Sequence, residues 1–399
     1  MPTSLDPPES GAWRPGTVRD AAGGIVALTI ATFLAVTTEM VPVGLLPLIG
    51  KGLEVSEPTA GLLVTVYAFM VAALAVPLTL WTARLPRKGM LLGTLIAYTV
   101  SNAIVWLAPD FALVAVGRAV GGLSHALFFS LSIGYAARLV QPAFTGRALA
   151  LVTAGASAGF VLGVPLSTSL GTALGWRNAF LVLAVVCALT VVLVALLLPA
   201  VPGGGGIAED EGRGVRRGRL ALVSATNAVV YLGQNCVYTY VSVLLLAAGL
   251  AAAGVGPVLL GIGALGLLGT WFAGVWLDRR PRLTVLIVLS TVVVGLLLLG
   301  FVFPALIAVL VAGALWGAGF GGVASVFQTA AIRTQGASPD IVGALVNATA
   351  NIGIGGGAAL GGAVLAGFGL GWLPFVGAAL VLVGIVAVLV GKRAFPAAP

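Results

Sequence analysis

Charged residues are scarce in this chain. Only 8% of its 399 residues are Asp, Glu, Lys or Arg, whereas 60% are hydrophobic. A soluble domain carries roughly 25% charged residues, so this composition excludes an ordinary soluble fold. Histidine occurs once and cysteine twice. Because Cys187 and Cys236 both lie within apolar segments, we interpret them as small buried side chains and expect neither a disulfide nor a metal site.

Two kinds of catalytic motif are also missing. No H-E-x-x-H sequence is present, and no G-x-x-x-x-G-K-[ST] loop for binding nucleotide phosphates. The second absence excludes direct coupling to ATP, and we expect no cofactor. The net charge of +8 comes from cations placed singly or in small groups between apolar runs, not from a basic face. We therefore expect no nucleic-acid partner.

Long apolar runs dominate the chain instead. A helix needs about 20 apolar residues to cross a membrane. The sequence predicts an all-α integral membrane protein with twelve spans, at residues 22–47, 58–81, 89–107, 111–137, 147–170, 177–199, 220–246, 254–277, 283–303, 304–330, 341–366 and 371–391.

Lysine and arginine predict the orientation of these spans. With both termini on the cytoplasmic side, every Lys and Arg falls in a cytoplasmic segment except Lys51, Arg177 and Arg118. This is the bias expected from the positive-inside rule. We predict a multi-pass protein of the cell membrane, with a cytoplasmic tail (1–21), a first six-helix half (22–200), a cytoplasmic linker (201–219), a second half (220–392) and a short cytoplasmic tail (393–399).

The two predicted halves repeat one another. The pattern W-x-x-R-x-P-R occurs at Trp81 and again at Trp276, 195 residues later. The pattern A-x-x-G-x-x-x-G occurs at Ala156 and at Ala350, 194 residues later. Two matches at nearly the same offset, on equivalent elements, indicate an internal repeat and therefore two pseudo-symmetric six-helix bundles.

Several of these motifs resemble those of the major facilitator superfamily. Residues 274–282 are similar to its loop signature G-x-x-x-D-R-x-G-R. The copy in the first half departs from it, with Ala83 in place of the acid and Pro86 in place of the glycine, a form similar to that of sugar, arabinose and ribonucleoside efflux permeases. Further matches lie at residues 38–47, 118–122, 159–165 and 351–353. Over residues 22–392 the chain resembles the twelve-helix drug:proton antiporters of this superfamily.

Three ionisable residues lie deep within predicted spans, namely Glu39, Arg118 and His125. A charge within hydrocarbon is expensive, which makes each a functional candidate. Counting residues from the span ends places Glu39 and Arg118 at the same depth, roughly 12 Å below the outer surface, with His125 about 10 Å deeper than Arg118. In the family that the chain resembles, the first and fourth spans line the central cavity, so we expect Glu39 and Arg118 to be near enough to pair.

We hypothesise that Glu39 carries the proton, with Arg118 and His125 in the coupling site. Burial favours the neutral form of a carboxyl group and a nearby guanidinium favours its charged form, so an arriving substrate can change the balance. The alternative is that Glu39 and Arg118 form a static buried pair. His125 has two interpretations as well, a proton relay or a histidine bonded to a neighbouring carbonyl.

The seventh span carries a polar stripe on one helical face, formed by Asn227, Tyr231, Gln234 and Tyr238. We predict that it forms an aromatic and amide wall of a substrate cavity, with Gln328, Asn347 and Asn351 as weaker candidates. Polar contacts between helices are the alternative. Gly159, Gly163 and Pro165 are predicted to act in close packing and a kink between the halves. The loop residues predicted to hold the cytoplasmic gate are Arg84, Arg87, Lys88, Asp278, Arg279 and Arg282.

The sequence therefore predicts a secondary transporter, not an enzyme. We expect it to export a small organic compound, a drug or a metabolite, in exchange for protons by alternating access, as a monomer in the lipid bilayer. Proton-coupled uptake of a sugar or nucleoside-like solute is an alternative, because no motif fixes the direction. An intramembrane enzyme and a channel are remote alternatives, since the chain shows neither catalytic spacing nor a filter loop.

Overall fold

The computed structural model describes residues 15–82, 85–201, 214–337 and 339–397. Twelve of the helices in these residues are long and apolar enough to cross a membrane, from Ala22–Gly52 to Leu370–Val390. Their bounds lie within a few residues of the twelve predicted spans. The prediction of an all-α membrane protein with twelve spans is thus confirmed.

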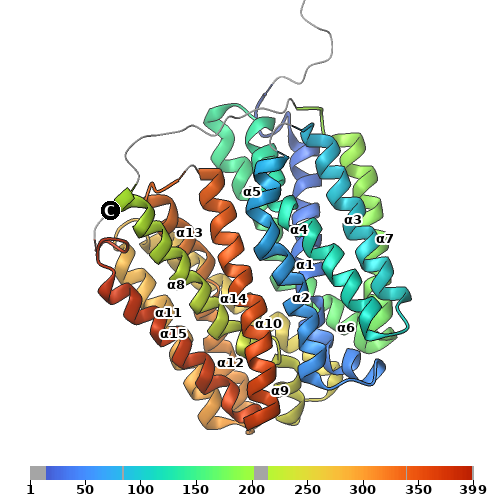
Figure 1. Cartoon of the computed structure of the whole chain (residues 1–399), viewed down its shortest axis with the longest axis vertical. Coiled ribbons are helices and arrows are strands. Elements are labelled where there is room, and N and C mark those ends of the chain that lie inside the picture. Colours follow the sequence, from blue (N-terminus) through green and yellow to red (C-terminus); the bar gives the residue numbers. More distant parts are fainter. Residues whose placement is uncertain (1–14, 83–84, 202–213, 338, 398–399) are drawn as a thin grey trace, which may run out of the picture.

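The first six spans form the N-terminal half, which is blue to green in Figure 1. Its fifth span is built from three consecutive pieces, in which a π-helical turn joins two α-helices. The elements are α1 (Ala22–Gly52), α2 (Glu57–Trp81), α3 (Arg87–Leu107), α4 (Phe111–Leu139), η1 (Pro142–Phe144), α5 (Thr145–Ala158), η2 (Gly159–Gly163), α6 (Val164–Leu174) and α7 (Trp176–Leu197).

The other six spans form the C-terminal half, which lies beside the first in Figure 1. Its first helix begins at Gly214, inside the segment predicted as linker. The elements are α8 (Gly214–Tyr238), α9 (Val241–Ala247), α10 (Ala252–Trp276), α11 (Pro281–Val302), α12 (Leu306–Phe320), α13 (Val323–Arg333), α14 (Pro339–Phe368), η3 (Leu370–Trp372) and α15 (Leu373–Val390).

Helix starts follow the local sequence. The Ser56 hydroxyl accepts a hydrogen bond from the backbone N–H of Thr59 at the start of α2, and the Asp110 carboxylate accepts one from Leu113 at the start of α4. Both side chains satisfy donors that a helix leaves unpaired. Gly175 and Gly369 precede the last spans of the two halves with φ of 95° and 87°. They are 194 residues apart, so the repeat extends to these turns.

Each half has its own hydrophobic core. One core contains buried residues of the N-terminal half only, from Ala21 to Leu198. The other fills the C-terminal half and also includes Met40 and Val43 of α1 and Val64 of α2. The second core therefore extends across the boundary and holds part of the N-terminal half against the C-terminal half.

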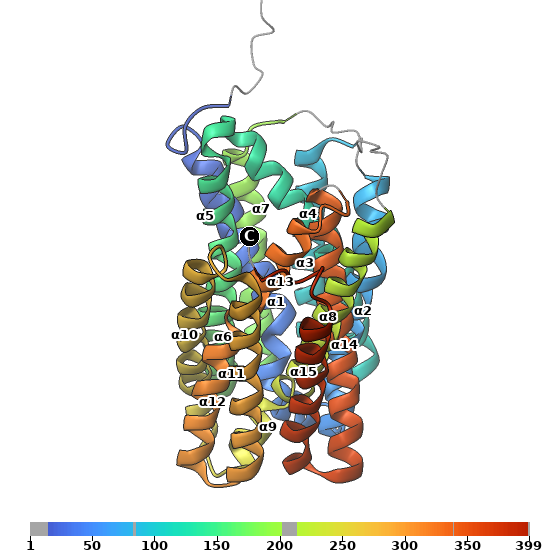
Figure 2. The same cartoon turned by 90° about the vertical axis from the view of Figure 1, so that its left-hand side faces the viewer.

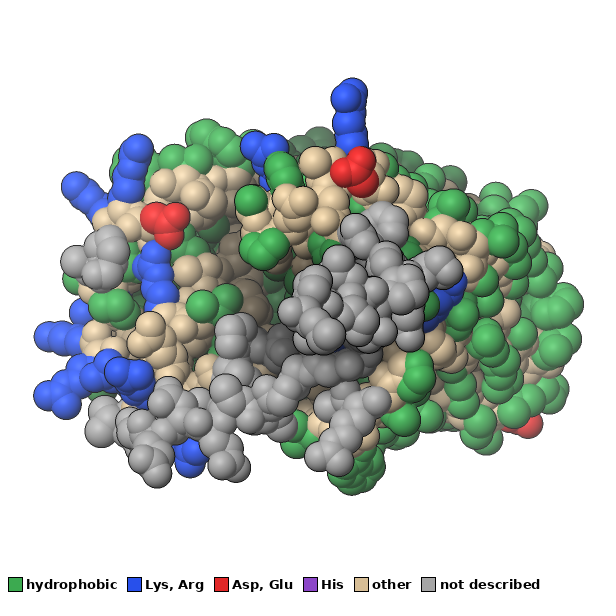
Figure 3. All heavy atoms as spheres, turned by 90° about the horizontal axis from the view of Figure 1, so that it is seen from above, with side chains coloured by type: hydrophobic (Ala, Val, Ile, Leu, Met, Phe, Trp, Pro, Cys, Tyr) green, Lys and Arg blue, Asp and Glu red, His purple; other side chains and the backbone are tan. Residues whose placement is uncertain are grey.

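The side of the molecule that carries residues 15–21 and 391–397 is called here the terminal face, and the opposite side the far face. In Figure 2 the terminal face is directed upward, with the start of the described chain at the top and the C-terminal end, marked C, lower down. Near the far face the halves are joined directly, because the Ser242 hydroxyl donates to the carbonyl oxygen of Val43 at 2.7 Å and the Thr65 hydroxyl donates to that of Gly355 at 2.9 Å. Seen from the terminal face, the surface is hollowed between the two halves (Figure 3). The structure is thus closed at the far face and open at the terminal face.

Candidate functional site

The middle of α1 is the most enclosed part of the site. Every residue from 34 to 46 is buried, and the Glu39 side chain in its centre leaves the residue only 5% exposed. The Glu39 Oε1 atom is buried and has no hydrogen-bond partner among the described residues. An ionised carboxylate in such surroundings is costly unless it is compensated.

His125 of α4 is the side chain that faces this carboxyl group. Its Nε2 atom lies 3.7 Å from Glu39 Oε2, and the two form an ion pair only when the imidazole is protonated. Its Nδ1 atom is 3.0 Å from the hydroxyl of Tyr67 on α2, and its ring stacks on Phe129 with a centroid distance of 4.8 Å. The three side chains of Tyr67, His125 and Glu39 thus form a buried row across α2, α4 and α1.

Arg118 lies beside Glu39 and binds backbone carbonyls. Its guanidinium donates to the backbone carbonyls of Thr38 (2.5 Å), Glu39 (2.6 Å) and Leu63 (3.3 Å). The same group lies 4.2 Å above the Tyr67 ring centroid. Arg118 and Glu39 are neighbours, as predicted from depth. The hydrogen bond of Arg118 goes to the backbone oxygen of residue 39, while the carboxylate faces His125.

The sequence of α1 explains why Arg118 finds a carbonyl there. In an α-helix the oxygen of residue 38 accepts the N–H of residue 42, and Pro42 has no N–H to donate. The Thr38 oxygen is therefore left for Arg118. Pro47 likewise leaves the Val43 oxygen free, and the Ser242 hydroxyl of α9 donates a hydrogen bond to it. Both prolines of α1 expose a carbonyl that a neighbouring helix then binds.

The polar stripe of α8 divides into two kinds of contact. The Asn227 amide donates to the Val346 oxygen and to the Thr349 hydroxyl, both at 3.1 Å, which ties α8 to α14. The Gln234 oxygen accepts from the Trp316 indole N–H at 2.6 Å, which ties α8 to α12. These two positions make the contacts that the helix-packing alternative describes.

The two tyrosines of the stripe remain partly exposed. Tyr231 meets Phe320 edge to face at 5.6 Å between ring centroids, and Tyr238 meets Trp316 at 6.1 Å. The C-terminal half thus presents an aromatic edge formed by residues of α8 and α12.

The weaker cavity candidates are buried or half-buried. Asn351 is buried and donates to the Asn347 backbone oxygen at 3.1 Å, while Asn347 itself is half-buried. Gln328 on α13 is half-buried as well. Among the described residues, no group of three or more His, Cys, Asp or Glu side chains is arranged to hold a metal ion.

The residues predicted to act in close packing and a kink lie where three helices meet. The π-helical turn η2 begins at Gly159 and ends at Gly163. Pro165 lies two residues after it and has no N–H to donate, which disturbs the regular hydrogen bonding of this span. A Cβ atom on Gly159 would lie 2.9 Å from the Phe33 oxygen of α1, and one on Gly256 of α10 would lie 2.9 Å from the Pro165 oxygen. The turn is thus packed between α1 and a helix of the other half, and only small residues fit there.

The predicted gate loops contact helix ends. Asp278 pairs with Arg333 at 2.7 Å. Lys88 donates to the Ala195 oxygen at 2.8 Å, and Arg282 to the Leu389 oxygen at 2.5 Å. Arg87 begins α3 and Arg279 is exposed, whereas Arg84 lies outside the described residues.

Sequence reasoning missed Tyr67, Ser242 and Trp316, three uncharged polar residues of the site. The sequence around them does not distinguish them from other uncharged polar residues in apolar helices. The prolines of α1 did carry a signal for two contacts. The residue four positions before each proline has a free carbonyl oxygen, which predicts a donor from a neighbouring helix, and Arg118 and Ser242 are those donors.

Comparison with known proteins shows which family the chain is similar to. Residues 28–339 match the profile of the Major Facilitator Superfamily. Two chloramphenicol efflux pumps of Mycobacterium tuberculosis, strains CDC 1551 / Oshkosh and ATCC 25618 / H37Rv, are each 34% identical over 360 residues, covering 88% of this chain and 87% of theirs.

Solved structures share the fold. A bacterial homologue of the human lysosomal transporter Spinster, crystallised in an inward-facing and unoccupied conformation, aligns with a TM-score of 0.73 and 15% identity over 95% of this chain and 98% of its own. The human organic anion transporter MFSD10 (TETRAN) aligns with a TM-score of 0.69 and 18% identity over 96% and 100%. The resemblance inferred from the motifs is confirmed, and the chain belongs to the major facilitator superfamily of transporters.

Proposed function

We propose that this transporter exports a small organic compound from the cell in exchange for protons. The observation that carries the proposal is the Glu39 carboxyl group, which is buried in α1 with one oxygen unpaired and the other facing His125. Intramembrane carboxylates at such sites are suited to binding and releasing a proton as the cavity changes sides. The efflux pumps that the chain resembles support the export direction.

In alternating access the central site opens to the terminal face in one step and to the far face in another. We place both termini in the cytoplasm of a cell-membrane protein, so the open terminal face is the cytoplasmic one. Substrate then enters from the cytoplasm while the far face is closed by the contacts of Ser242 and Thr65. The return to the outside requires those contacts to break and the halves to rock about the site near the midplane.

The substrate we propose is a neutral, partly aromatic compound such as chloramphenicol. Tyr231 and Phe320 present aromatic edges from the C-terminal half, and Asn347 is half-buried nearby on α14. Stacking supplies affinity for an aromatic ring, and amide or hydroxyl groups orient a polar tail. The two relatives, named as chloramphenicol efflux pumps, support this class of compound.

Transport into proteoliposomes tests the proposal. Vesicles with an acidic lumen and labelled chloramphenicol outside should accumulate the label with the wild-type protein and not with Glu39→Gln. Glu57→Gln is the matched control, because Glu57 is exposed at the start of α2. No accumulation by the wild type would contradict the substrate class. Equal accumulation by wild type and Glu39→Gln would contradict the role of Glu39 in coupling.

A further inference from the structure

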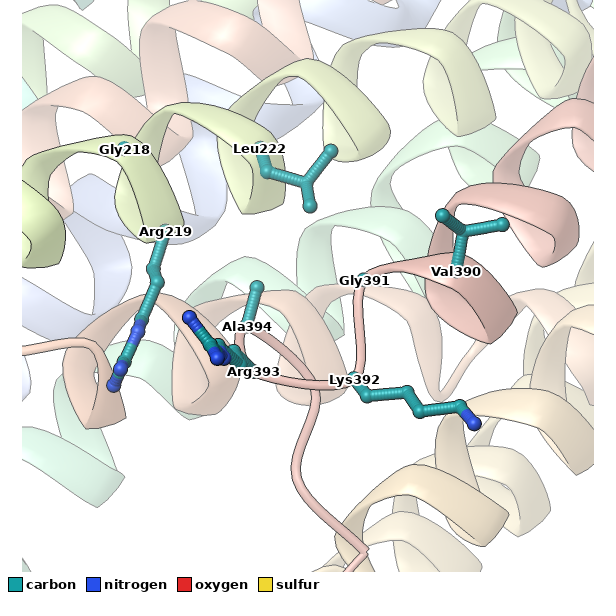
Figure 4. Close-up of a pocket in the computed structure, with 8 residues that line it drawn as sticks. All are labelled: Gly218, Arg219, Leu222, Val390, Gly391, Lys392, Arg393 and Ala394. Atoms are coloured by element: carbon teal, nitrogen blue, oxygen red, sulfur yellow. The ribbon is translucent and has the colours of Figure 1, made fainter.

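A second pocket lies on the terminal face, away from the central site. It is formed where α8 begins and where the chain leaves α15, and its volume is about 400 Å³. Its lining includes Arg219, Leu222, Val390, Lys392 and Arg393. Figure 4 shows Arg219 descending from α8 and Arg393 extending toward it from the C-terminal segment, while Lys392 points away.

The C-terminal wall of the pocket is fixed to the bundle. Phe395 is 2% exposed and packs edge to face on Phe327 of α13, with 6.4 Å between ring centroids. Arg282 holds the last turn of α15 through the Leu389 oxygen at 2.5 Å. The segment that carries Lys392 and Arg393 is therefore positioned by packing.

The described lining of the pocket contains cations and no acid. None of its lining residues is Asp or Glu, and no described carboxylate forms an ion pair with Arg219 or Arg393. The Arg219 Nε atom is buried and has no hydrogen-bond partner among the described residues. An unpaired buried donor of this kind is costly, and two guanidinium groups around one space suit a phosphate group, which they bind in a bidentate manner.

The same pocket is also lined by exposed apolar side chains. Leu222 is 37% exposed and Val390 is 78% exposed. Both lie at span ends, because α15 ends at Val390 and the span of α8 and α9 begins at Arg216. A ligand with an anionic head and an apolar tail would contact both parts, whereas free phosphate would use only the cations.

We propose that this pocket binds the phosphate group of an anionic phospholipid. The headgroup phosphate lies between the side chains of Arg219 and Arg393, and an acyl chain runs along Leu222 and Val390. The lipid belongs to the leaflet at the terminal face. The site is independent of the substrate cavity and of proton coupling.

Lipid titration of the purified, delipidated protein tests the proposal. Binding is measured by native mass spectrometry and by thermal melting with dioleoylphosphatidylglycerol, dioleoylphosphatidylcholine and inorganic phosphate as separate probes. The test variant is Arg219→Gln with Arg393→Gln. The control is Arg217→Gln with Arg280→Gln, which removes the same charge from exposed residues outside the pocket.

The expected result is preferential binding of the phosphatidylglycerol by wild type and control, weakened by about tenfold in the test variant, equivalent to about 1.4 kcal/mol. Equal binding by all three proteins would overturn the site. Stabilisation by inorganic phosphate as strong as that by the lipid would overturn the lipid assignment. If the double variant does not fold, the single variant Arg393→Gln takes its place. Arg393 is exposed, so its replacement should not prevent folding, and lipid binding should still be reduced.

Discussion

The Ser242 hydroxyl of α9 donates a hydrogen bond to the Val43 carbonyl of α1 at 2.7 Å, across the boundary between the two halves. Both residues are completely buried. The acceptor is available because Pro47 cannot donate the helical N–H that would otherwise occupy it. A proline in one half and a serine in the other together make this bond across the closed far face.

Replacing Ser242 should therefore favour opening of the far face. Ser242→Ala leaves the Val43 carbonyl unpaired in the closed state, which costs about 1–3 kcal/mol. Spin labels on cysteines introduced at Lys51 and Ala252, both exposed at the far face on opposite halves, should report longer distances in the variant. The native Cys187 and Cys236 are buried, so labelling of the introduced sites is selective.

A double-mutant cycle provides the control for this interpretation. Pro47→Ala restores an N–H that can bond to Val43, so Ser242→Ala should have a smaller effect in that background. An effect of the same size with and without Pro47 would mean that the carbonyl is not the reason for it.

Arg118 should be needed for stability because its guanidinium donates hydrogen bonds to buried backbone carbonyls. Arg118→Gln leaves the buried Thr38 oxygen of α1 without a donor, which costs about 1–3 kcal/mol, and thermal melting in detergent should show the loss. Pro42→Ala supplies the N–H that Thr38 lacks and should recover part of it. A melting temperature unchanged by Arg118→Gln would show that Arg118 does not hold α4 against α1.

Alanine at the π-helical turn should separate close packing from helix propensity. In Gly159→Ala the new Cβ atom meets the Phe33 oxygen and the Val36 side chain at 2.9 Å, and such overpacking costs about 1–3 kcal/mol. Gly146→Ala is the control in the neighbouring helix α5, where a Cβ atom has nothing within 4 Å. The first variant should melt at a lower temperature and transport more slowly, and the second should not. Similar behaviour of both would exclude a packing role for Gly159.

The residues that sequence reasoning found share one property. Glu39, Arg118 and His125 are ionisable groups in apolar spans, and the cost of burying charge makes such residues conspicuous. The span bounds were predictable for the same physical reason, since length and hydropathy are set by the bilayer. Depth counting also placed Glu39 and Arg118 correctly beside each other.

The contacts of those residues were not predictable from charge alone. Opposite charges suggested that Arg118 faces the Glu39 carboxylate, but the guanidinium lies against backbone oxygens that prolines and helix geometry make available. Tyr67 and Trp316 were not identified, because an uncharged polar side chain in a span is common and its partner depends on how three helices pack. Asn227 and Tyr231 belong to one helical stripe, yet one bonds to α14 and the other faces Phe320.

His125 should influence proton movement and not substrate binding. It is the residue that connects Tyr67 with Glu39, so His125→Gln should slow substrate-dependent proton flux and change its pH profile, while chloramphenicol binding is retained. Tyr67→Phe, which removes only the hydroxyl bound to His125, should have a weaker effect in the same direction. A pH profile identical to that of the wild type in His125→Gln would remove this histidine from the proton path.

Lumenal pH under a substrate gradient alone tests the central claim most directly. Proteoliposomes with a pH dye inside and equal pH on both sides receive chloramphenicol outside. Exchange of substrate for protons predicts that the lumen becomes more alkaline with the wild type and stays unchanged with Glu39→Gln. Acidification of the lumen would instead indicate that substrate and protons move together, and an equal pH change in both proteins would contradict proton transfer through Glu39.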